Sequence, residues 1–431
     1  MNSTLAKKIF IMGAKYRNPS LWPEYDRLKE SEWYSSSRLK ELQLERLILF
    51  LEFAEKNSPY YKKLFRRCDF SVSGVSSIDD LKNIPAISKN ELIEHSKSIH
   101  TDYKFRKEFL AETSGTTGSG LEFKKNENWD SVNRASMMRA YDWYDVKPWD
   151  RHGYFWGYNI SLQHATKAKV LDYFQNRFRI FTYDKEMVEV FSRKLSSAIY
   201  VAGYSSMIYE VAKLINDLNM KKPILKLVKG TSEMILDVYQ VEAKKAFGRK
   251  IASEYGAAES GLIAFECPEG SMHINVEDVL VEVDENNEII VTNLVSYSYP
   301  VIRYKLGDVV TLSDEMCGCG RAHPIIKEII GRKGASVVGW QNIYPALTFY
   351  YVFKNLAIEK SVLLNYKAVQ KRKGLVDISI EGMVNVRHED ILIEELMKYF
   401  SNDVSFNIMF VNGFDSNNKK TQYFESYINL I

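Results

Sequence analysis

Apolar positions in the first hundred residues recur at helical spacing. Leu47, Phe50, Leu51 and Ala54 lie at i, i+3, i+4 and i+7, so they form one stripe on a helix that must end before Ser58-Pro59. From residue 109 to 254, short apolar runs typical of strands alternate with longer helical stretches. The predicted strands are 109–111, 154–156, 199–202, 225–228 and 250–254, and the predicted helices are 128–144 and 207–218. This alternation predicts α/β layering with a largely parallel sheet.

After Cys267 the pattern changes to pairs of strands. Residues 279–283 and 289–292 flank Asp284-Glu285-Asn286-Asn287, a polar sequence suited to a hairpin turn. Two further strands are predicted at 301–304 and 309–312, on either side of Gly307-Asp308. An antiparallel subdomain is therefore expected in this part of the chain.

Gly331-Arg332-Lys333-Gly334 interrupts the pattern, and we place a hinge there. Beyond it, strands near 361–369 and 375–381, a helix carrying Ile391, Leu392, Leu396 and Phe400, and a strand at 404–411 predict a small α+β domain. The predicted N-terminal domain covers residues 1–332, with a helical leader (1–100), an α/β core (101–266) and a β-rich part (267–332). The C-terminal domain covers 333–431.

Composition changes this picture little. The chain has 431 residues, with 58 basic and 55 acidic side chains and a net charge of +3, too near neutrality to suggest a nucleic-acid partner. Nothing approaches 18 consecutive apolar residues, and the apolar run Ile9–Ala14 after Lys7-Lys8 is too short for a signal peptide. We therefore expect a cytoplasmic protein without a transmembrane segment.

A glycine- and hydroxyl-rich loop, Thr113-Ser114-Gly115-Thr116-Thr117-Gly118-Ser119-Gly120, carries no bulky side chain. Glycines allow close backbone approach, and the amides and hydroxyls can donate to anionic oxygens, so the loop is a candidate phosphate cradle. Taken alone, the stretch is better explained as a solvated Ser/Thr/Gly loop. The predicted strand before it and the predicted helix after it would add a helix N-terminus to the cradle.

Three of the four cysteines fall in the β-rich part of the chain. Cys267, Cys317 and Cys319 with His273 make a Cys₃His set, which is a complete tetrahedral complement for structural zinc. His323 is an alternative to His273, and free thiols beside an ordinary histidine are the alternative to a metal site. Cys68 stands apart and is predicted to be inert.

The loop resembles the Thr-Ser-Gly-Thr-Thr-Gly signature of the adenylate-forming superfamily, the acyl-CoA ligases and their relatives. Three further stretches follow in that superfamily's order. Tyr255-Gly256-Ala257-Ala258-Glu259 is similar to its Tyr-Gly-x-x-Glu segment, Tyr304-Lys305-Leu306-Gly307-Asp308 to its Tyr-x-x-Gly-Asp segment, and Gly331-Arg332 to the Gly-Arg before its hinge. Four motifs in one order are much stronger evidence than any one of them.

Within the superfamily the chain resembles the branch of phenylacetate-CoA ligase and the CapK-like proteins of capsular polysaccharide biosynthesis. The similarity lies in Asn57-Ser58-Pro59-Tyr60-Tyr61, in Ile84-Pro85-Ala86-Ile87-Ser88-Lys89 and in the stretches 266–273 and 317–324. The chain departs from the superfamily pattern at Gly120, where proline is common, at Leu121, where lysine often follows, and at Lys333-Gly334, where many relatives have aspartate.

The resemblance implies roles for individual residues. Glu259 would engage Mg²⁺, Asp308 the ribose hydroxyls, Tyr255 the adenine, and Lys420 the reacting phosphate and carboxylate, with Lys419 as its alternative. The full set is Thr113, Ser114, Gly115, Thr116, Thr117, Gly118, Ser232, Glu233, Tyr255, Gly256, Ala257, Asp308 and Arg332 for the nucleotide; Lys420, Glu259 and Arg332 for catalysis; Trp156, Gly157 and Tyr158 for the acyl pocket; Cys267, His273, Cys317 and Cys319 for zinc; and Glu259 for Mg²⁺.

The implied function is an ATP-dependent ligase that joins a small carboxylic acid to AMP, releases pyrophosphate, and then transfers the acyl group to an acceptor. An amine or hydroxyl in surface or capsular polysaccharide biosynthesis is the favoured acceptor, and coenzyme A, as in an aryl-acid ligase, is the alternative. A third reading is a catalytically degenerate member that binds nucleotide within a biosynthetic complex. The expected cofactors are ATP/AMP, Mg²⁺ and structural Zn²⁺, and a homodimer is kept open.

Overall fold

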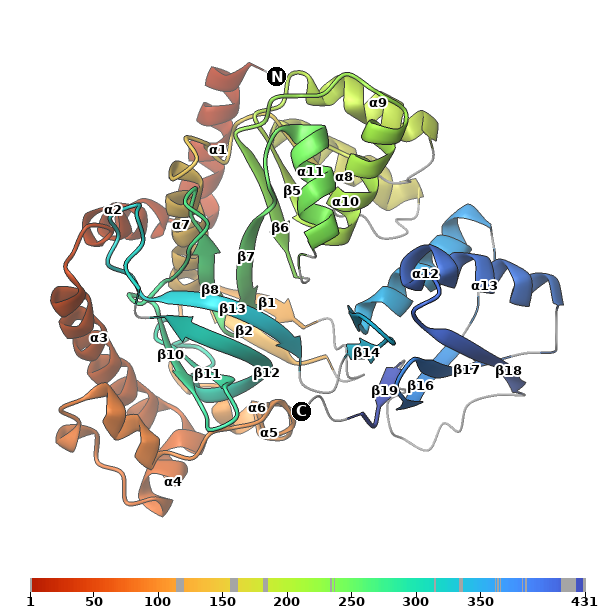
Figure 1. Cartoon of the computed structure of the whole chain (residues 1–431). Helices are drawn as coiled ribbons and strands as arrows, with labels where there is room; N and C mark the ends of the chain where they lie inside the picture. The colour runs from red at the N-terminus through yellow and green to blue at the C-terminus, as the bar shows by residue number, and fades with distance from the viewer. Residues whose placement is uncertain are drawn as a thin grey trace. The chain divides into compact units, whose positions relative to one another are not determined.

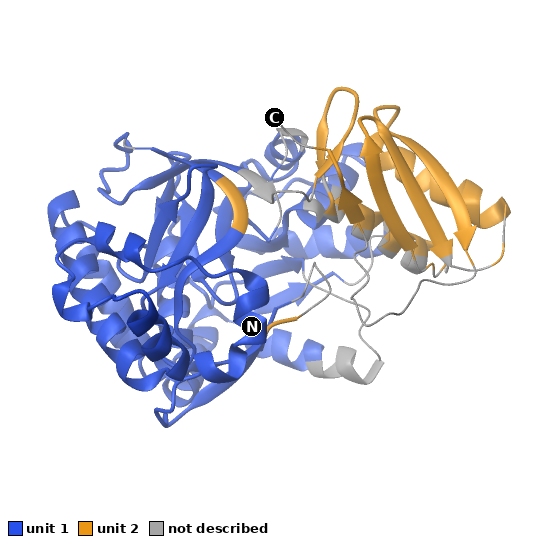
Figure 2. Ribbon diagram, turned by 90° about the horizontal axis from the view of Figure 1, so that it is seen from below, with its two compact units in different colours: residues 1–113, 122–306, 310–329 blue, residues 114–121, 307–309, 330–431 orange. Residues whose placement is uncertain are grey.

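The chain is built as two compact units. The computed structural model describes residues 2–113, 120–155, 162–180, 185–232, 235, 237–313, 315–332, 336–360, 362, 364, 366–381, 383, 386–411 and 424–428. Unit 1 comprises residues 1–113, 122–306 and 310–329, and unit 2 comprises 114–121, 307–309 and 330–431 (Figure 2). Along the chain, the last passage from unit 1 to unit 2 falls between Ile329 and Ile330, whereas the sequence prediction places the boundary after Arg332.

Unit 1 begins with a helical leader, as predicted. Its helices are α1 (Ser3–Arg17), α2 (Leu21–Ser31), α3 (Ser36–Asn57), α4 (Pro59–Arg67), α5 (Lys89–Glu94) and α6 (Ser96–Ile99), with short 3₁₀ turns at Val72–Gly74 and Ile78–Asn83. In α3 the side chains of Leu47, Phe50, Leu51 and Ala54 are buried. The helix ends at Asn57, because Pro59 lacks the N–H that would continue it and instead starts α4 as its first residue.

The centre of unit 1 is an eleven-stranded sheet with the order β10-β11-β12-β13-β9-β8-β7-β6-β5-β3-β4 (Figure 1). Its parallel half contains β3 (His152–Phe155), β4 (Arg177–Arg179), β5 (Tyr200–Tyr204), β6 (Leu227–Thr231) and β7 (Ala252–Ala257). The intervening helices are α8 (Leu162–Phe174), α9 (Lys185–Leu195), α10 (Ser205–Asp217) and α11 (Asp237–Phe247). Side chains of α9, α10 and α11 bury the apolar face of these strands, for example Val188, Val211 and Phe247.

The β-rich part of the chain continues the same sheet. Its strands are β8 (Gly261–Glu266), β9 (Met272–Ile274), β10 (Val279–Val283), β11 (Glu288–Asn293), β12 (Val301–Ser313) and β13 (Ile325–Arg332). The pairs β7–β8, β8–β9, β9–β13 and β10–β11 are antiparallel, and the predicted hairpin turn at 284–287 joins β10 to β11. The parallel and antiparallel halves therefore meet at β7.

Two sequence predictions are corrected here. Residues 301–312 are not two strands around a turn but one long strand, β12, because Gly307 takes a φ of +89° and bends the strand without ending it. The loop after Thr113 is not followed directly by a helix. It joins β1 (Glu108–Glu112) to β2 (Glu122–Asn126) in an antiparallel hairpin, and α7 (Glu127–Asp142) starts only afterwards. The alternation of exposed Glu122, buried Phe123 and exposed Lys124 is the strand signal that was missed.

Unit 2 has a four-stranded sheet with the order β18-β17-β16-β19, from the strands β16 (Tyr366–Arg372), β17 (Leu375–Glu381), β18 (Ser405–Val411) and β19 (Phe424–Ser426). Helices α12 (Leu347–Glu359) and α13 (Val386–Phe400) bury Phe349, Leu396 and Phe400 with the strands in a core of its own. A small hairpin, β14 (Ser336–Val338) with β15 (Ile343–Pro345), precedes α12. The α+β composition was predicted, but α12 was not.

Candidate active site and metal centre

Glu259 lies in the tight turn between β7 and β8, where its side chain is only 4% exposed. The hydroxyl of Tyr304, on β12, donates a hydrogen bond to Glu259 Oε1 over 3.0 Å. The side chain of Asn293 donates to the Glu259 backbone carbonyl over 3.1 Å. Glu259 Oε2 accepts no hydrogen bond from the residues that the structure describes. Two motifs that are 45 residues apart in sequence therefore meet through one hydrogen bond.

Two glycines shape this turn. A Cβ on Gly256 would lie 2.3 Å from the carbonyl oxygen of Gly261 on the opposite strand, closer than any carbon–oxygen contact tolerates. Gly261 itself has a φ of +76°, which favours glycine. The glycine of the Tyr-Gly-x-x-Glu motif is thus required by the packing of β7 against β8, and that packing fixes the start of the turn that carries Glu259.

Residues 84–89 of the N-terminal leader hydrogen-bond to the segment of β12 around Tyr304. Ile87 donates its N–H to the Arg303 carbonyl over 2.8 Å and accepts from the N–H of Lys305 over 2.9 Å. The Arg303 guanidinium bonds to Glu282 over 3.0 Å and also to the carbonyl of Ile84, while Arg303 itself has a φ of +50°, unusual for a residue with a side chain. These contacts tie the segment 84–89 to the strand that holds Tyr304.

Lys125 is a candidate that the sequence did not single out. It lies on β2, with its ammonium 5.2 Å from the ring centre of Trp129 and 5.7 Å from that of Phe123. Burial lowers the pKa of Lys125, and the negative charges of Asp130 and Glu259 oppose that shift. A half-buried cation in the field of Glu259 belongs to the electrostatics of the candidate site. The sequence signal was weak, because a lysine in a polar Lys124-Lys125 pair usually faces solvent.

The structure describes some of the predicted site residues and not others. Thr113 is buried at the end of β1, Tyr255 is half-buried on β7, and Asp308 lies on β12 directly after Gly307. Ser232 is exposed, with a φ of +67°. The backbone of Arg332 ends β13, but its side chain lies outside the described part. Outside the described residues lie Ser114, Gly115, Thr116, Thr117, Gly118, Trp156, Gly157, Tyr158, Glu233, Lys333, Gly334, Lys419 and Lys420.

His152 is a core residue. Its ring stacks on Tyr200 with centroids 4.4 Å apart, and Nδ1–H donates to the Asp150 carbonyl over 2.9 Å. Burial lowers the pKa of His152 to about 3, so the ring is neutral at physiological pH. Its place on β3 thus has a structural explanation that needs no catalytic role.

Cys267, His273, Cys317 and Cys319 come together as a cluster whose candidate ligand atoms all lie within 4.8 Å of one another. The Cys267 and Cys317 sulfurs are 3.6 Å apart, and the Cys319 sulfur is 3.2 Å from His273 Nε2. Sulfur and nitrogen ligands of a tetrahedral zinc ion are separated by about 3.3–3.8 Å, given bond lengths of about 2.0–2.3 Å. The donor set and its spacing therefore fit zinc.

Neighbouring groups orient the two histidines differently. His273 Nδ1 lies 3.3 Å from the His323 carbonyl, so a proton held there leaves the lone pair of Nε2 pointing at the cysteines. Burial lowers the pKa of His273 to about 4, which favours the neutral ring that a metal requires. His323 Nε2 instead lies 3.0 Å from Glu277 Oε1, a carboxylate also bonded by Arg139. The geometry favours His273 over His323 as the fourth ligand.

The cluster joins three parts of the chain. Cys267 follows β8, His273 lies on β9, and Cys317 and Cys319 lie in the connection between β12 and β13. The N–H of Cys319 points to the Cys317 sulfur over 3.4 Å, as in many metal-binding turns. Burial raises the pKa of Cys267 well above its usual range, so a divalent cation must displace the thiol proton.

Comparison with known proteins agrees with this architecture. No family model matches the chain. The chain is 26% identical to protein CapK of Staphylococcus aureus over 331 residues, covering 72% of this chain and 70% of CapK. It is 23% identical to phenylacetate-coenzyme A ligase of Thermus thermophilus over 378 residues, covering 81% of this chain and 82% of that ligase.

Solved structures share the fold. Crystal structures of 2-hydroxyisobutyryl-CoA ligase match with a TM-score of 0.61 in the postadenylation state, covering 92% of this chain and 91% of that one, and 0.62 in the thioesterification state, covering 93% and 92%. Sequence identity is 15% in both cases. The predicted fold class is confirmed: a large α/β domain with a small C-terminal α+β domain, as in adenylate-forming ligases.

Proposed function

We propose that this chain, a member of the adenylate-forming superfamily in the branch of CapK and phenylacetate-CoA ligase, activates a carboxylic acid with ATP. The acid oxygen attacks the α-phosphorus, the bond to pyrophosphate breaks, and an acyl-adenylate forms. An acceptor then attacks the acyl carbon, and AMP leaves. Phenylacetate-coenzyme A ligase and the structural neighbours named above are ligases, whereas the acid, the acceptor and the residues that act on them are part of the proposal.

The observation that carries the proposal is the buried carboxylate of Glu259, held by Tyr304. A carboxylate that is 4% exposed is costly unless a cation or donors compensate for its burial. One oxygen accepts from Tyr304, and no donor in the described part of the chain reaches the other, which would bind Mg²⁺. The Mg²⁺ that the superfamily resemblance implies would neutralise phosphate charge as it develops. Glu259 would hold that ion, and Tyr304 would fix the orientation of Glu259.

The remaining nucleotide contacts follow the motif order. We assign the β- and γ-phosphates to the hydroxyl and amide donors of Thr113 to Gly118, the adenine to Tyr255 and the backbone near it, and the ribose diol to Asp308. Ser232 and Glu233 follow β6 and are assigned to the adenine edge. Arg332 and Lys420, which lie near the two ends of the segment 330–431 of unit 2, are assigned to the reacting phosphate. A rotation of unit 2 about the hinge at 331–334 would then exchange the adenylation and transfer arrangements.

For the acceptor we propose an amine or hydroxyl used in surface polysaccharide biosynthesis. The identity to CapK, 26% over 72% of the chain, supports this choice. Coenzyme A is the competing acceptor, and the 23% identity to phenylacetate-coenzyme A ligase over 81% of the chain supports it. Hydroxamate trapping separates acid activation from transfer, and omission of coenzyme A from the assay then separates the two acceptors.

The Cys₃His cluster is proposed to hold a structural Zn²⁺. Three thiolates and an imidazole leave no open position for substrate, so the ion would act by fixing β8, β9 and the β12–β13 connection, not by chemistry. The cluster lies at the end of β8, and the β7–β8 turn that carries Glu259 precedes the start of the same strand, so the metal would stabilise a strand of the candidate active site from its far end.

The test is acid-dependent release of pyrophosphate from ATP, measured over a panel of aryl acids, uronic acids and amino acids. Glu259→Gln keeps the size of the side chain but removes the charge that holds Mg²⁺, and it should lower kcat on the order of 100-fold. Glu269→Gln, at an exposed position, is the matched control and should leave the rate unchanged. Lys420→Ala should slow adenylation to a similar degree.

The result also separates the enzyme from a degenerate homologue. If the folded protein binds ATP but no acid on the panel releases pyrophosphate, the nucleotide-binding reading replaces the ligase. If Glu259→Gln and Glu269→Gln behave alike in an active protein, the assignment of Glu259 is wrong although the ligase stands.

A further inference from the structure

Helix α1 has two apolar faces, and only one of them is used by the fold. Ala6, Phe10 and Ala14 face inward, where Phe10 and Ala14 pack with Leu21, Leu28, Ala135 and Met138. Leu5, Ile9, Met12 and Tyr16 lie at i, i+4, i+7 and i+11, within an arc of about 60° on the opposite side. Leu5 is 50% exposed, Met12 65% and Tyr16 86%. We call these four residues the outer stripe.

Basic side chains flank the outer stripe. Helix α1 contains Lys7, Lys8, Lys15 and Arg17 and no acidic residue. Arg17 is paired with Asp130 over 3.2 Å, but Lys8 and Lys15 are exposed and have no carboxylate within ion-pair distance in the described part of the chain. Lys107 adds a third cation beside the C-terminal turn of the helix, because its ammonium bonds the Tyr16 carbonyl over 2.9 Å. The outer stripe therefore lies among unneutralised lysines.

Basic charge alone does not distinguish α1. Helix α4 also carries four basic residues and no acidic one, but its apolar side chains Tyr61, Leu64 and Phe65 are buried. Of these two helices, α1 is the one in which the charge accompanies an exposed apolar stripe. That combination fits a surface that offers both negative charge and an apolar layer, which is the interface of an anionic bilayer. A nucleic acid would satisfy the lysines but leave Leu5 and Met12 in water.

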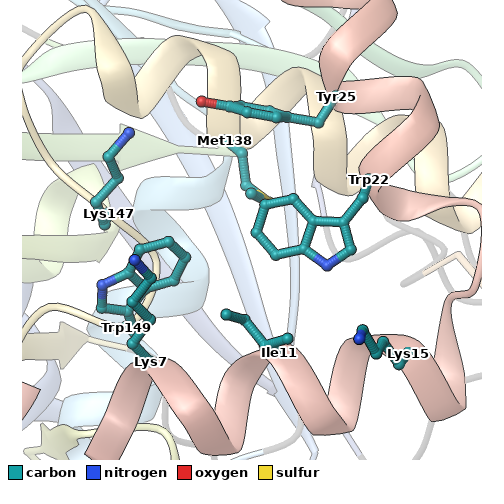
Figure 3. Close-up of a pocket in the computed structure, with 8 residues that line it drawn as sticks. All are labelled: Lys7, Ile11, Lys15, Trp22, Tyr25, Met138, Lys147 and Trp149. Carbon is teal, nitrogen blue, oxygen red and sulfur yellow. The ribbon is translucent and has the colours of Figure 1, made fainter. Parts of the chain in front are cut away.

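A cavity of about 520 Å³ opens along the edge of the same helix (Figure 3). Lys7, Ile11 and Lys15 of α1 line it, opposite Trp22, Tyr25, Met138, Lys147 and Trp149. The Lys7 ammonium lies 5.6 Å from the ring centre of Trp149. Tryptophan, tyrosine and lysine around an apolar recess are the side chains that prefer the headgroup region of a membrane.

We propose that α1 docks unit 1 on an anionic lipid bilayer. The outer stripe inserts at the headgroup–acyl boundary, Lys8, Lys15 and Lys107 contact lipid phosphates, and the aromatic cavity lies at headgroup level. No helix in the described ranges is long and apolar enough to cross a membrane, so the association is peripheral. The proposal is independent of the adenylation chemistry, since none of these residues belongs to the candidate active site.

The test is co-sedimentation of the full chain with vesicles. Vesicles that contain phosphatidylglycerol should bind it, and pure phosphatidylcholine vesicles should not. Each lysine near an anionic surface contributes about a fivefold gain in binding, so Lys8→Glu with Lys15→Glu should weaken binding by at least about 30-fold. Leu5→Ser with Met12→Ser should weaken it by about tenfold or more at unchanged net charge.

Two controls make the outcome decisive. Lys62→Glu with Lys63→Glu on α4 makes the same change of net charge on exposed side chains and should leave vesicle binding intact. Pyrophosphate release without lipid should be equal in all variants and shows that each is folded. The proposal is overturned if the wild type does not sediment with phosphatidylglycerol, if it binds phosphatidylcholine equally, or if the α4 variant loses binding as α1 variants do. Binding to heparin that survives Leu5→Ser with Met12→Ser, without vesicle binding, would identify a polyanion site instead.

Discussion

At the residue scale, His152 has a structural role on β3. It is buried, stacked on Tyr200, and hydrogen-bonded to the Asp150 carbonyl. Its folded-state pKa is about 3, against 6.5 in an exposed chain, because burial disfavours the imidazolium. Between these two pH values the His152 imidazole is protonated in the unfolded chain and neutral in the folded chain.

Stability should therefore fall as the pH is lowered from 6.5 toward 3. His152 contributes a slope of about 1.4 kcal/mol per pH unit in that window and nothing above pH 7. His152→Phe keeps the stacking and removes the titration, so urea unfolding between pH 7 and pH 5 should show a shallower decline than in the wild type. An identical decline in both proteins would mean that His152 is not the titrating group.

Lys125 is the residue whose importance we expect from the structure alone. Its ammonium lies near the rings of Phe123 and Trp129 and in the field of Glu259, the residue to which we assign Mg²⁺. Lys125→Met keeps the length and the apolar packing but removes the charge. The KM for ATP should rise roughly tenfold, as for a lost charged contact of about 1.4 kcal/mol, with little change in thermal stability.

The matched control for Lys125 is Lys124→Met on the same strand. Lys124 is exposed and pairs with Glu108 over 3.4 Å, a surface contact worth little. Equal effects of the two substitutions on the KM for ATP would remove Lys125 from the site.

At the scale of elements, the β7–β8 hairpin decides where Glu259 lies. Gly256→Ala would place a Cβ 2.3 Å from the Gly261 carbonyl, so the two strands must separate. We expect a loss of about 2 kcal/mol or more in unfolding free energy, and a larger proportional loss of activity because the turn moves. Gly74→Ala has no atom within 4 Å of the new Cβ and should stay within about 0.5 kcal/mol of the wild type. Comparable melting temperatures for both variants would contradict this packing argument.

The metal cluster is a second element-scale feature. Metal analysis of protein purified without chelator should give about one zinc per chain. Cys319→Ser should lose the zinc and several kcal/mol of stability, because binding free energy at a structural site is folding free energy. Cys68→Ser is the control, since the Cys68 thiol only donates to the Leu64 carbonyl on its own helix. Less than about half an equivalent of zinc, or zinc retained by Cys319→Ser, would argue for free thiols.

At the scale of the molecule, much of the fold could be predicted because its signals are local. The stripe of α3, the alternation of strands and helices, and the hairpin at 284–287 depend on neighbouring residues. What was missed depends on distant ones. The sequence Glu122–Asn126 pairs as a strand only because β1 is beside it, and 301–313 stays one strand because Gly307 absorbs the bend. Helix α12 was missed since its aromatic-rich sequence lacks a clear period.

The candidate site likewise has residues that the sequence motifs predict and contacts that only the folded structure shows. The motifs predict roles for Glu259, Tyr255 and Asp308, because the residue types and their order are visible in the sequence, and these roles stay predictions. The hydrogen bond from Tyr304 to Glu259 and the field of Glu259 at Lys125 were not visible, since they depend on the register of β12 and on the fold of β2 beside the β7–β8 turn. The preference for His273 over His323 likewise required the Glu277 contact.

The central claim is that this chain makes an acyl-adenylate. Isotope exchange between pyrophosphate and ATP tests it most directly, because exchange requires the adenylation step and no acceptor. The account predicts exchange that depends on at least one carboxylic acid of the panel and on Mg²⁺, and that Glu259→Gln slows on the order of 100-fold. Acid-independent exchange, or none with any acid from a folded protein that binds ATP, would contradict it.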